Sequence, residues 1–114
     1  MSHPTQTPPR GEVVDLADAD AADWLDTHPL CLLAFLAGQD DTSLRMRARL
    51  AIVGAKTGVA IGVLDVDHHR LIAAGLGVKQ APMVLVFANG EVVDRLIGTP
   101  PEAILEDVVR TRLR

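Results

Sequence analysis

The chain has 114 residues, a formal net charge of −4 and 48% hydrophobic residues. This length is enough for one domain with a single buried core, and no apolar run approaches the roughly 20 residues that a membrane-spanning helix needs. The negative charge argues against nucleic acid as a partner. The single cysteine, Cys31, excludes an intramolecular disulfide and makes the cytoplasm the expected location.

The first eleven residues differ in composition from the rest of the chain. Residues 1–11 contain Pro4, Pro8 and Pro9 and no apolar block. This composition predicts a disordered leader and not a signal peptide. Residues 12–114 are then expected to form one domain.

The next segment predicts a strand, a helix and a second strand. Glu12–Leu16 alternates weakly, as a short strand does, and Asp18 or Asp20 can cap a helix that Pro29 ends. Leu30–Ala37 is a continuous apolar run, which is typical of a strand buried on both faces.

A longer helix is predicted after residue 40. Asp40–Ser43 is rich in residues that cap helix N-termini, and Gly58 can close the helix. Apolar residues recur between these limits at helical spacing: Leu44, Ala48, Ala51, Ile52 and Ala55.

Val59–Val66 is β-branched and apolar and therefore predicts another buried strand. Asp67 is expected to cap a short helix that ends at the glycines Gly75 and Gly77.

The last segment predicts a hairpin and a helix. Met83–Phe87 and Glu91–Ile97 read as strands joined by Ala88–Gly90, where Asn-Gly favours the positive φ angles of a tight turn. Pro100 or Pro101 is expected to start the final helix. Its predicted buried stripe is Ile104, Leu105, Val108 and Val109.

The predicted order is βαβαβαββα. Two buried strands with crossover helices, followed by an antiparallel hairpin, indicate an α/β fold with a central mixed sheet and helices on both faces.

The order and the residues together resemble the thioredoxin family. Asp67–Pro82 has the family's spacing between an aspartate and a cis-proline, and Phe87–Glu91 is similar to its Phe-x-Asn-Gly hairpin. Further matches are Phe35, Ala37, Gly77 and Gly98. The resemblance covers the chain from about Glu12 to Leu113 and implies a thioredoxin-like fold.

The resemblance implies that the Ala81–Pro82 bond is cis and faces the segment where the family keeps its redox motif. The backbone of Ala81 would then be available to an extended peptide, much as a sheet edge is. An ordinary trans proline at the start of a strand is the alternative.

The chain departs from the family at its redox centre. Thiol–disulfide exchange needs a thiolate and a second, resolving thiol. The resemblance places Asp40 and Ser43 at the two cysteine positions, Ala34 at the buried aspartate, and Leu36 and Gln39 at the flanking tryptophans. We therefore expect a redox-inactive protein that is not an enzyme.

Other reactive residues have simpler explanations. Cys31 lies in an apolar run and is expected to be a buried structural cysteine. The adjacent His68 and His69 would point about 100° apart on a helix, which does not predict a metal site. Ser43 has no histidine at a spacing that suggests a catalytic triad. No metal or cofactor is expected.

Two acidic residues at the replaced motif leave two interpretations open. Asp40 and Asp41 are stabilising at a helix N-terminus, by about 0.3–1 kcal/mol each, so capping alone could explain them. Beside a peptide groove they would also favour a segment that carries Arg or Lys. The predicted partner-binding residues are Asp40, Asp41, Thr42, Ser43, Ala81 and Pro82.

Charge is also distributed unevenly along the chain. Residues 12–41 carry eight acidic residues and no Lys or Arg, whereas residues 42–64 carry Arg45, Arg47, Arg49 and Lys56 and no acid. Two solvated helices of opposite sign explain this, and a polarised surface for a charged partner is the alternative.

The leading functional hypothesis is a redox-inactive thioredoxin-fold module that binds a protein or an extended basic peptide as a chaperone or assembly factor. It resembles the thioredoxin-like accessory proteins of bacterial uptake-hydrogenase maturation, which bind the twin-arginine signal of the small-subunit precursor. One alternative is a thiol-dependent oxidoreductase that uses Cys31. The other is a structural subunit of a larger complex, and the oligomeric state is left open.

Overall fold

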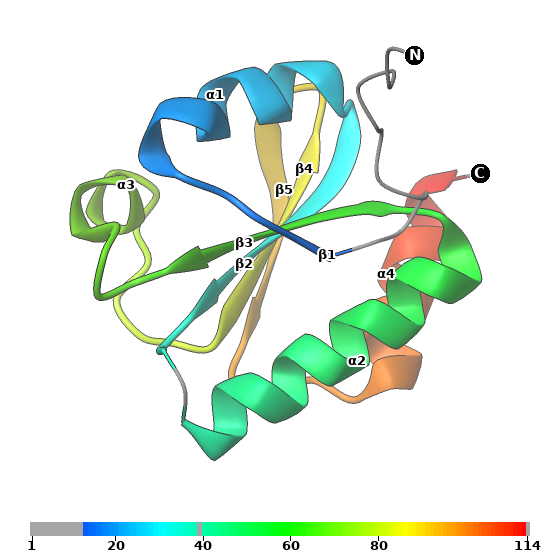
Figure 1. Ribbon diagram of the computed structural model, residues 1–114. Coiled ribbons are helices and arrows are strands. Elements are labelled where there is room, and N and C mark those ends of the chain that lie inside the picture. The colour runs from blue at the N-terminus through cyan, green and yellow to red at the C-terminus, as the bar shows by residue number, and fades with distance from the viewer. Residues whose placement is uncertain (1–12, 39, 114) are drawn as a thin grey trace, which may run out of the picture.

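The computed structural model describes residues 13–38 and 40–113, whose strands form one mixed sheet in the order β1-β3-β2-β4-β5 (Figure 1). β1 and β2 are parallel to β3, β4 is antiparallel to β2, and β5 is antiparallel to β4. The strands are β1 Val13–Asp15, β2 Leu30–Leu36, β3 Ala60–Asp65, β4 Met83–Ala88 and β5 Glu91–Ile97. The predicted leader, residues 1–11, and the start of the domain at residue 12 lie outside the described residues.

Helices cover both faces of this sheet. The helices are α1 Asp18–Thr27, α2 Asp41–Thr57, α3 Arg70–Gly75 and α4 Glu102–Leu113. Figure 1 shows α1 and α3 on one face and α2 with α4 on the other. The predicted α/β fold, a mixed sheet flanked by helices on both sides, is confirmed.

Strand β2 explains why the sheet is buried on both faces. Leu32 and Leu36 point into a core with α2 and α4, whereas Leu33 and Phe35 point into a second core with α1 and α3. Because successive side chains alternate between faces, a strand covered on both sides must be apolar throughout. The continuous apolar run in the sequence is this strand.

Helix α2 has the predicted extent, but its buried side is not the one that the apolar spacing marks. The residues at that spacing are all exposed: Leu44, Ala48, Ala51, Ile52 and Ala55. The helix instead packs on the sheet through Met46, Leu50 and Val53. These three side chains fill the space above the sheet, whereas three of the five residues on the exposed side are alanines, which would fill it poorly.

Two predicted helix starts are wrong. The N-cap position of α1 falls on Ala17, not on Asp18 or Asp20. Helix α3 begins at Arg70 and has no side-chain cap, because residues 65–69 form a turn before it. The N–H of Asp67 donates to the carboxylate Oδ1 of Asp65 at 2.8 Å, so Asp67 lies in that turn.

The C-terminal elements follow the prediction except at the first residue of α4 and at one residue of its buried stripe. Asn89 and Gly90 have φ angles of 54° and 84°, as the hairpin requires. Helix α4 starts at Glu102, after both prolines. Leu105 and Val109 are buried, but Ile104 is 48% exposed, because a neighbouring helix position is turned by about 100°.

Candidate functional site

Asp40 and Ser43 hold the start of α2 together by hydrogen bonds. Asp40 is the N-cap residue, and its Oδ1 accepts a hydrogen bond from the backbone N–H of Ser43 at 2.7 Å. The Ser43 hydroxyl in turn accepts from the backbone N–H of Ala37 at 2.8 Å. The Ser43 residue is only 1% exposed. Both residues are therefore used to fix the loop between β2 and α2.

This loop passes close to the carboxylates that follow β3. A Cβ atom added to Gly38 would lie 3.9 Å from Oδ2 of Asp65 and 4.0 Å from Oδ2 of Asp67. The hydrogen bond from the Asp67 N–H lowers the pKa of Asp65, with a further contribution from His68. Both aspartates thus lie at the same end of the sheet as the start of α2, and this end is acidic.

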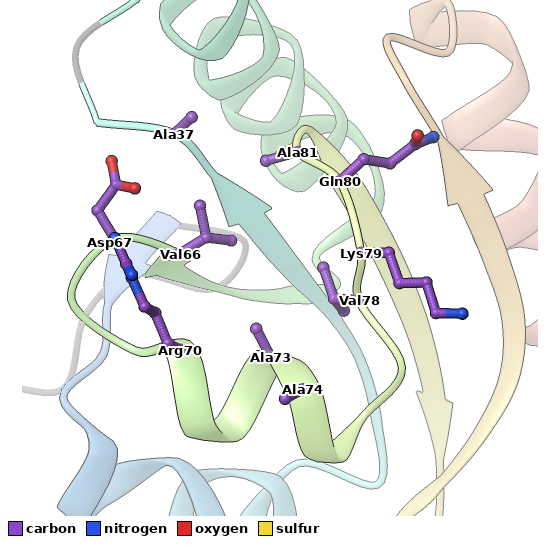
Figure 2. A pocket seen from close by; sticks show the side chains of 10 residues that line it. All are labelled: Ala37, Val66, Asp67, Arg70, Ala73, Ala74, Val78, Lys79, Gln80 and Ala81. Carbon is purple, nitrogen blue, oxygen red and sulfur yellow. The ribbon is translucent and has the colours of Figure 1, made fainter.

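A pocket of about 420 Å³ opens between α3 and the segment that precedes β4 (Figure 2). Its apolar lining comes from Ala37, Val66, Ala73, Ala74, Val78 and Ala81. Ala73 and Val78 are buried and Val66 is half-buried, and Figure 2 shows these side chains directed toward the hollow.

Polar residues surround the apolar lining. Asp67, Arg70, Lys79 and Gln80 are exposed and also line the pocket. In Figure 2, Lys79 and Gln80 extend outward on the side of the pocket away from Asp67. A hollow with an apolar floor and a few polar groups at its rim is the usual form of a binding site.

The Ala81–Pro82 bond is cis, as the resemblance implies. Pro82 is buried, and its carbonyl accepts a hydrogen bond from the N–H of Gly98 at 2.9 Å. Across residues 13–38 and 40–113, the peptide N–H and carbonyl of Ala81 take part in no hydrogen bond. Ala81 therefore presents free backbone groups at the edge of the pocket.

The structure separates the predicted site residues into two groups. Ala81 lines the pocket, together with Ala37 from the end of β2. Residues 40–43 do not line it, although the Ser43 hydroxyl holds the backbone of Ala37. The sequence reasoning missed Val66, Arg70 and Val78. The segment Asp67–Pro82, whose spacing resembles that of the family, contains Arg70 and Val78 and directly follows Val66. This segment was the sequence signal that could have indicated these three residues.

Cys31 does not have the properties of a reactive thiol. It is 0% exposed, and burial raises the pKa of its thiol to about 12. Its strand neighbours are Ala60 and Phe87. A thiol with such a pKa stays protonated near neutral pH and is a poor nucleophile.

Neither a metal site nor a membrane span is found within the described residues. No group of three or more His, Cys, Asp or Glu in residues 13–38 and 40–113 could hold a metal ion. None of the described helices is long and apolar enough to cross a bilayer.

The chain is similar in sequence to thioredoxins over about half of its length, and no protein-family model matches it. It is 39% identical to thioredoxin-like protein 1 of Schizosaccharomyces pombe over 61 residues, which are 54% of this chain and 21% of the relative. It is 38% identical over 50 residues to the thioredoxin of Staphylococcus saprophyticus, and 36% identical over 50 residues to that of Bacillus subtilis. Each of these two alignments covers 44% of this chain and 48% of the relative, so the chain matches about half the length of these relatives or less.

Solved structures match nearly the whole chain. A variant thioredoxin from Halobacterium salinarum superposes with a TM-score of 0.85 at 22% identity, over 93% of this chain and 95% of that one. The thioredoxin of Trypanosoma brucei brucei gives a TM-score of 0.81 at 16% identity, over 96% and 97%. At such identities the likeness establishes the fold.

Proposed function

We propose that this chain, a thioredoxin-like protein with one cysteine, binds an extended segment of a partner protein and performs no thiol chemistry. The observation that carries the proposal is the hydrogen-bonded start of α2, where the resemblance would place two cysteines. A carboxylate and a hydroxyl that hold a loop cannot attack or resolve a disulfide. Cys31 is buried, and burial raises the pKa of its thiol, which argues against the alternative of a thiol-dependent enzyme.

The pocket and its surroundings support binding of an extended segment. Ala81 offers free backbone groups beside an apolar hollow, so main-chain hydrogen bonds and an anchoring side chain can be combined. Two large apolar side chains near this end of the molecule are strongly exposed, Leu71 in α3 at 87% and Ile97 at the end of β5 at 59%. Ile97 pairs with Met83, the residue after Pro82. Exposed apolar surface around a pocket favours a protein partner.

The charges near the pocket favour a basic segment. Asp40 and Asp41 at the start of α2, with Asp65 and Asp67 after β3, give four carboxylates, against Arg70 and Lys79 at the pocket rim. Opposite charges improve encounter and selectivity more than raw affinity. A twin-arginine signal, such as that of a hydrogenase small-subunit precursor, has this chemistry. The specific form of our proposal is a bacterial cytoplasmic chaperone or assembly factor for such a precursor.

Titration calorimetry with a synthetic twin-arginine signal peptide tests this proposal. The matched control peptide has both arginines replaced by glutamine. We expect the arginine peptide to bind more tightly at low salt, and Asp40→Lys combined with Asp41→Lys to weaken it. Equal binding of both peptides would show that the arginine charges do not select the peptide. No binding of either peptide would contradict a twin-arginine partner.

A second pair of variants tests the pocket. Val66→Trp fills the hollow with a larger side chain and is expected to weaken binding of the arginine peptide. Ala22→Trp is the control, because Ala22 is exposed in α1 and does not line the pocket. If Val66→Trp bound the arginine peptide as tightly as the wild type does, the peptide would have to bind outside the pocket.

A further inference from the structure

One wall of the pocket has few links to the sheet. This wall is the loop of residues 76–81, which we call the wall loop, and its last four residues line the hollow. Figure 2 shows these four residues on the side opposite Asp67. Helix α3, which precedes the wall loop, has only six residues, and only Ala73 among them is buried. The position of the wall loop therefore depends on a small number of contacts.

The backbone hydrogen bonds of the wall loop are local. The N–H of Gly77 donates to the carbonyl of Ala74 at 3.1 Å, and the N–H of Val78 donates to the carbonyl of Ala73 at 2.8 Å. Among the described residues, the backbone groups of residues 79–81 take part in no hydrogen bond. These bonds tie the loop to α3 and not to the sheet.

One side chain of the sheet reaches the wall loop. Arg95 in β5 pairs with Leu85 of β4, whose side chain lies in the core with α1 and α3, so Arg95 lies on the same face. Its Nη1 donates to the carbonyl oxygen of Leu76 at 2.8 Å. A Cβ atom added to Gly77 would lie 3.7 Å from Nη1 and 3.8 Å from Nη2 of Arg95. Among the described residues, no other side-chain hydrogen bond joins the wall loop to the sheet.

Gly77 turns the chain directly after the Leu76 carbonyl. Its φ angle of 75° lies in the left-handed region that favours glycine. Within the part of the chain that the structure describes, the Leu76 carbonyl accepts a hydrogen bond from Arg95 and from no other group. The guanidinium of Arg95 therefore fixes this end of the wall loop against β5.

The position of the wall loop controls both features that peptide binding would use. Val78 is buried and belongs to the apolar lining, so a shift of the loop changes the width of the hollow. Ala81 carries the free backbone groups at the edge of the pocket, and a hydrogen bond weakens steeply when its angle falls below about 120°. A displaced loop would therefore bind an extended segment less well.

We propose that Arg95 is a positioning residue, whose bond to the Leu76 carbonyl holds the wall loop in the geometry that accepts an extended segment. This inference rests on the proposed function, because it gives Arg95 a role in peptide binding at the same pocket. Arg95 acts through the backbone of the wall loop and not by contact with the peptide.

The sign of the effect on binding separates positioning from charge. Arg95 is a cation and the proposed ligand is basic, so charge alone would make Arg95→Ala bind the synthetic twin-arginine peptide more tightly. Positioning has the opposite effect. In titration calorimetry we expect Arg95→Ala to weaken that peptide by about fivefold or more, as the loss of one hydrogen bond would. Arg95→Lys keeps a donor on a side chain of similar length and should recover most of this loss.

Arg112→Ala is the matched control. Nη2 of Arg112 donates to the carbonyl of Val93 at 3.5 Å, so it also joins an arginine to a backbone carbonyl across 19 residues, but from α4 on the other face of the sheet. This variant should bind the peptide like the wild type. Unchanged or tighter binding by Arg95→Ala, an equal loss in Arg112→Ala, or no recovery in Arg95→Lys would overturn the proposal.

Residual dipolar couplings of the labelled full chain without peptide supply an independent readout. They report the orientation of each backbone N–H, which a bond that only adds stability would leave unchanged. In Arg95→Ala we expect the couplings of residues 77–81 to depart from those of the wild type, while the couplings of β2 and β4 stay the same. Unchanged couplings in the wall loop would overturn the proposal. If the wild type bound no peptide, the proposed function would fail, but the couplings would still decide whether Arg95 positions the wall loop.

Discussion

Removing the hydroxyl of Ser43 tests whether the residues at the start of α2 are structural. In Ser43→Ala the backbone N–H of Ala37 loses its acceptor at 2.8 Å in a partly buried position. A buried donor left without a partner costs about 1–3 kcal/mol of unfolding free energy. Asp40→Ala removes the N-cap bond to the Ser43 N–H and should cost about 0.5–2 kcal/mol.

Guanidinium unfolding followed by the fluorescence of Trp24, the single tryptophan, measures these losses. Thr42→Ala is the matched control, because Thr42 is exposed in the same turn and should change stability by no more than about 0.5 kcal/mol. Asp40→Asn separates capping from charge, since asparagine caps as well as aspartate. It should keep the stability and weaken binding of the arginine peptide. If Ser43→Ala and Asp40→Ala were as stable as Thr42→Ala, the structural account of the loop would be refuted.

The remaining predictions concern the core and the thiol. Gly62→Ala should destabilise the fold by about 1–3 kcal/mol, since its Cβ would lie 2.6 Å from Leu16 and 3.2 Å from Trp24. Gly75→Ala has open space and should stabilise by about 0.4–1 kcal/mol in the same unfolding assay. Cys31 should react with a thiol reagent at pH 8 only after denaturation, and fast native labelling would contradict its burial. Burial raises the pKa of the Cys31 thiol from 9.0 to about 12, so above pH 9 the thiol ionises more readily in the unfolded chain than in the folded one. The contribution of the buried, protonated thiol to the free energy of unfolding is therefore complete below pH 9 and should be lost as the pH rises toward 12. In Cys31→Ala, unfolding curves measured across this pH range should no longer show this part of the fall in the free energy of unfolding.

The elements with a single possible environment could be predicted from the sequence. The run from Leu30 must be buried on both faces, and only a central strand provides that environment. Asn89 and Gly90 favour positive φ angles, and the hairpin forms there. The capping residue Asp40 and the closing Gly58 fix the ends of α2 in the same local way.

The buried face of α2 could not be predicted because apolar residues occupy two of its sides. Met46 and Leu50 lie among the arginines Arg45, Arg47 and Arg49, whereas the alanines form a cleaner apolar pattern. Which side packs is decided by the volume available above the sheet, a tertiary property that spacing does not report.

The pocket escaped prediction for a related reason. Its apolar lining combines Ala37 from the end of β2 with Val66 and Val78 from separate loops, and the three residues share no sequence motif. The sequence pointed instead to the α2 N-terminus, because the resemblance places Asp40 and Ser43 at the positions of two cysteines. The structure shows Asp40 and Ser43 as the support of the neighbouring backbone.

The most direct test of peptide binding at the pocket is to map the synthetic twin-arginine peptide by the backbone amide shifts of the labelled full chain. We predict saturable changes concentrated at Val66–Arg70 and Val78–Ala81, which surround the hollow. Changes that map to α1 or to the exposed side of α2 that carries Leu44 and Ile52, with the pocket amides unmoved, would contradict binding at this site.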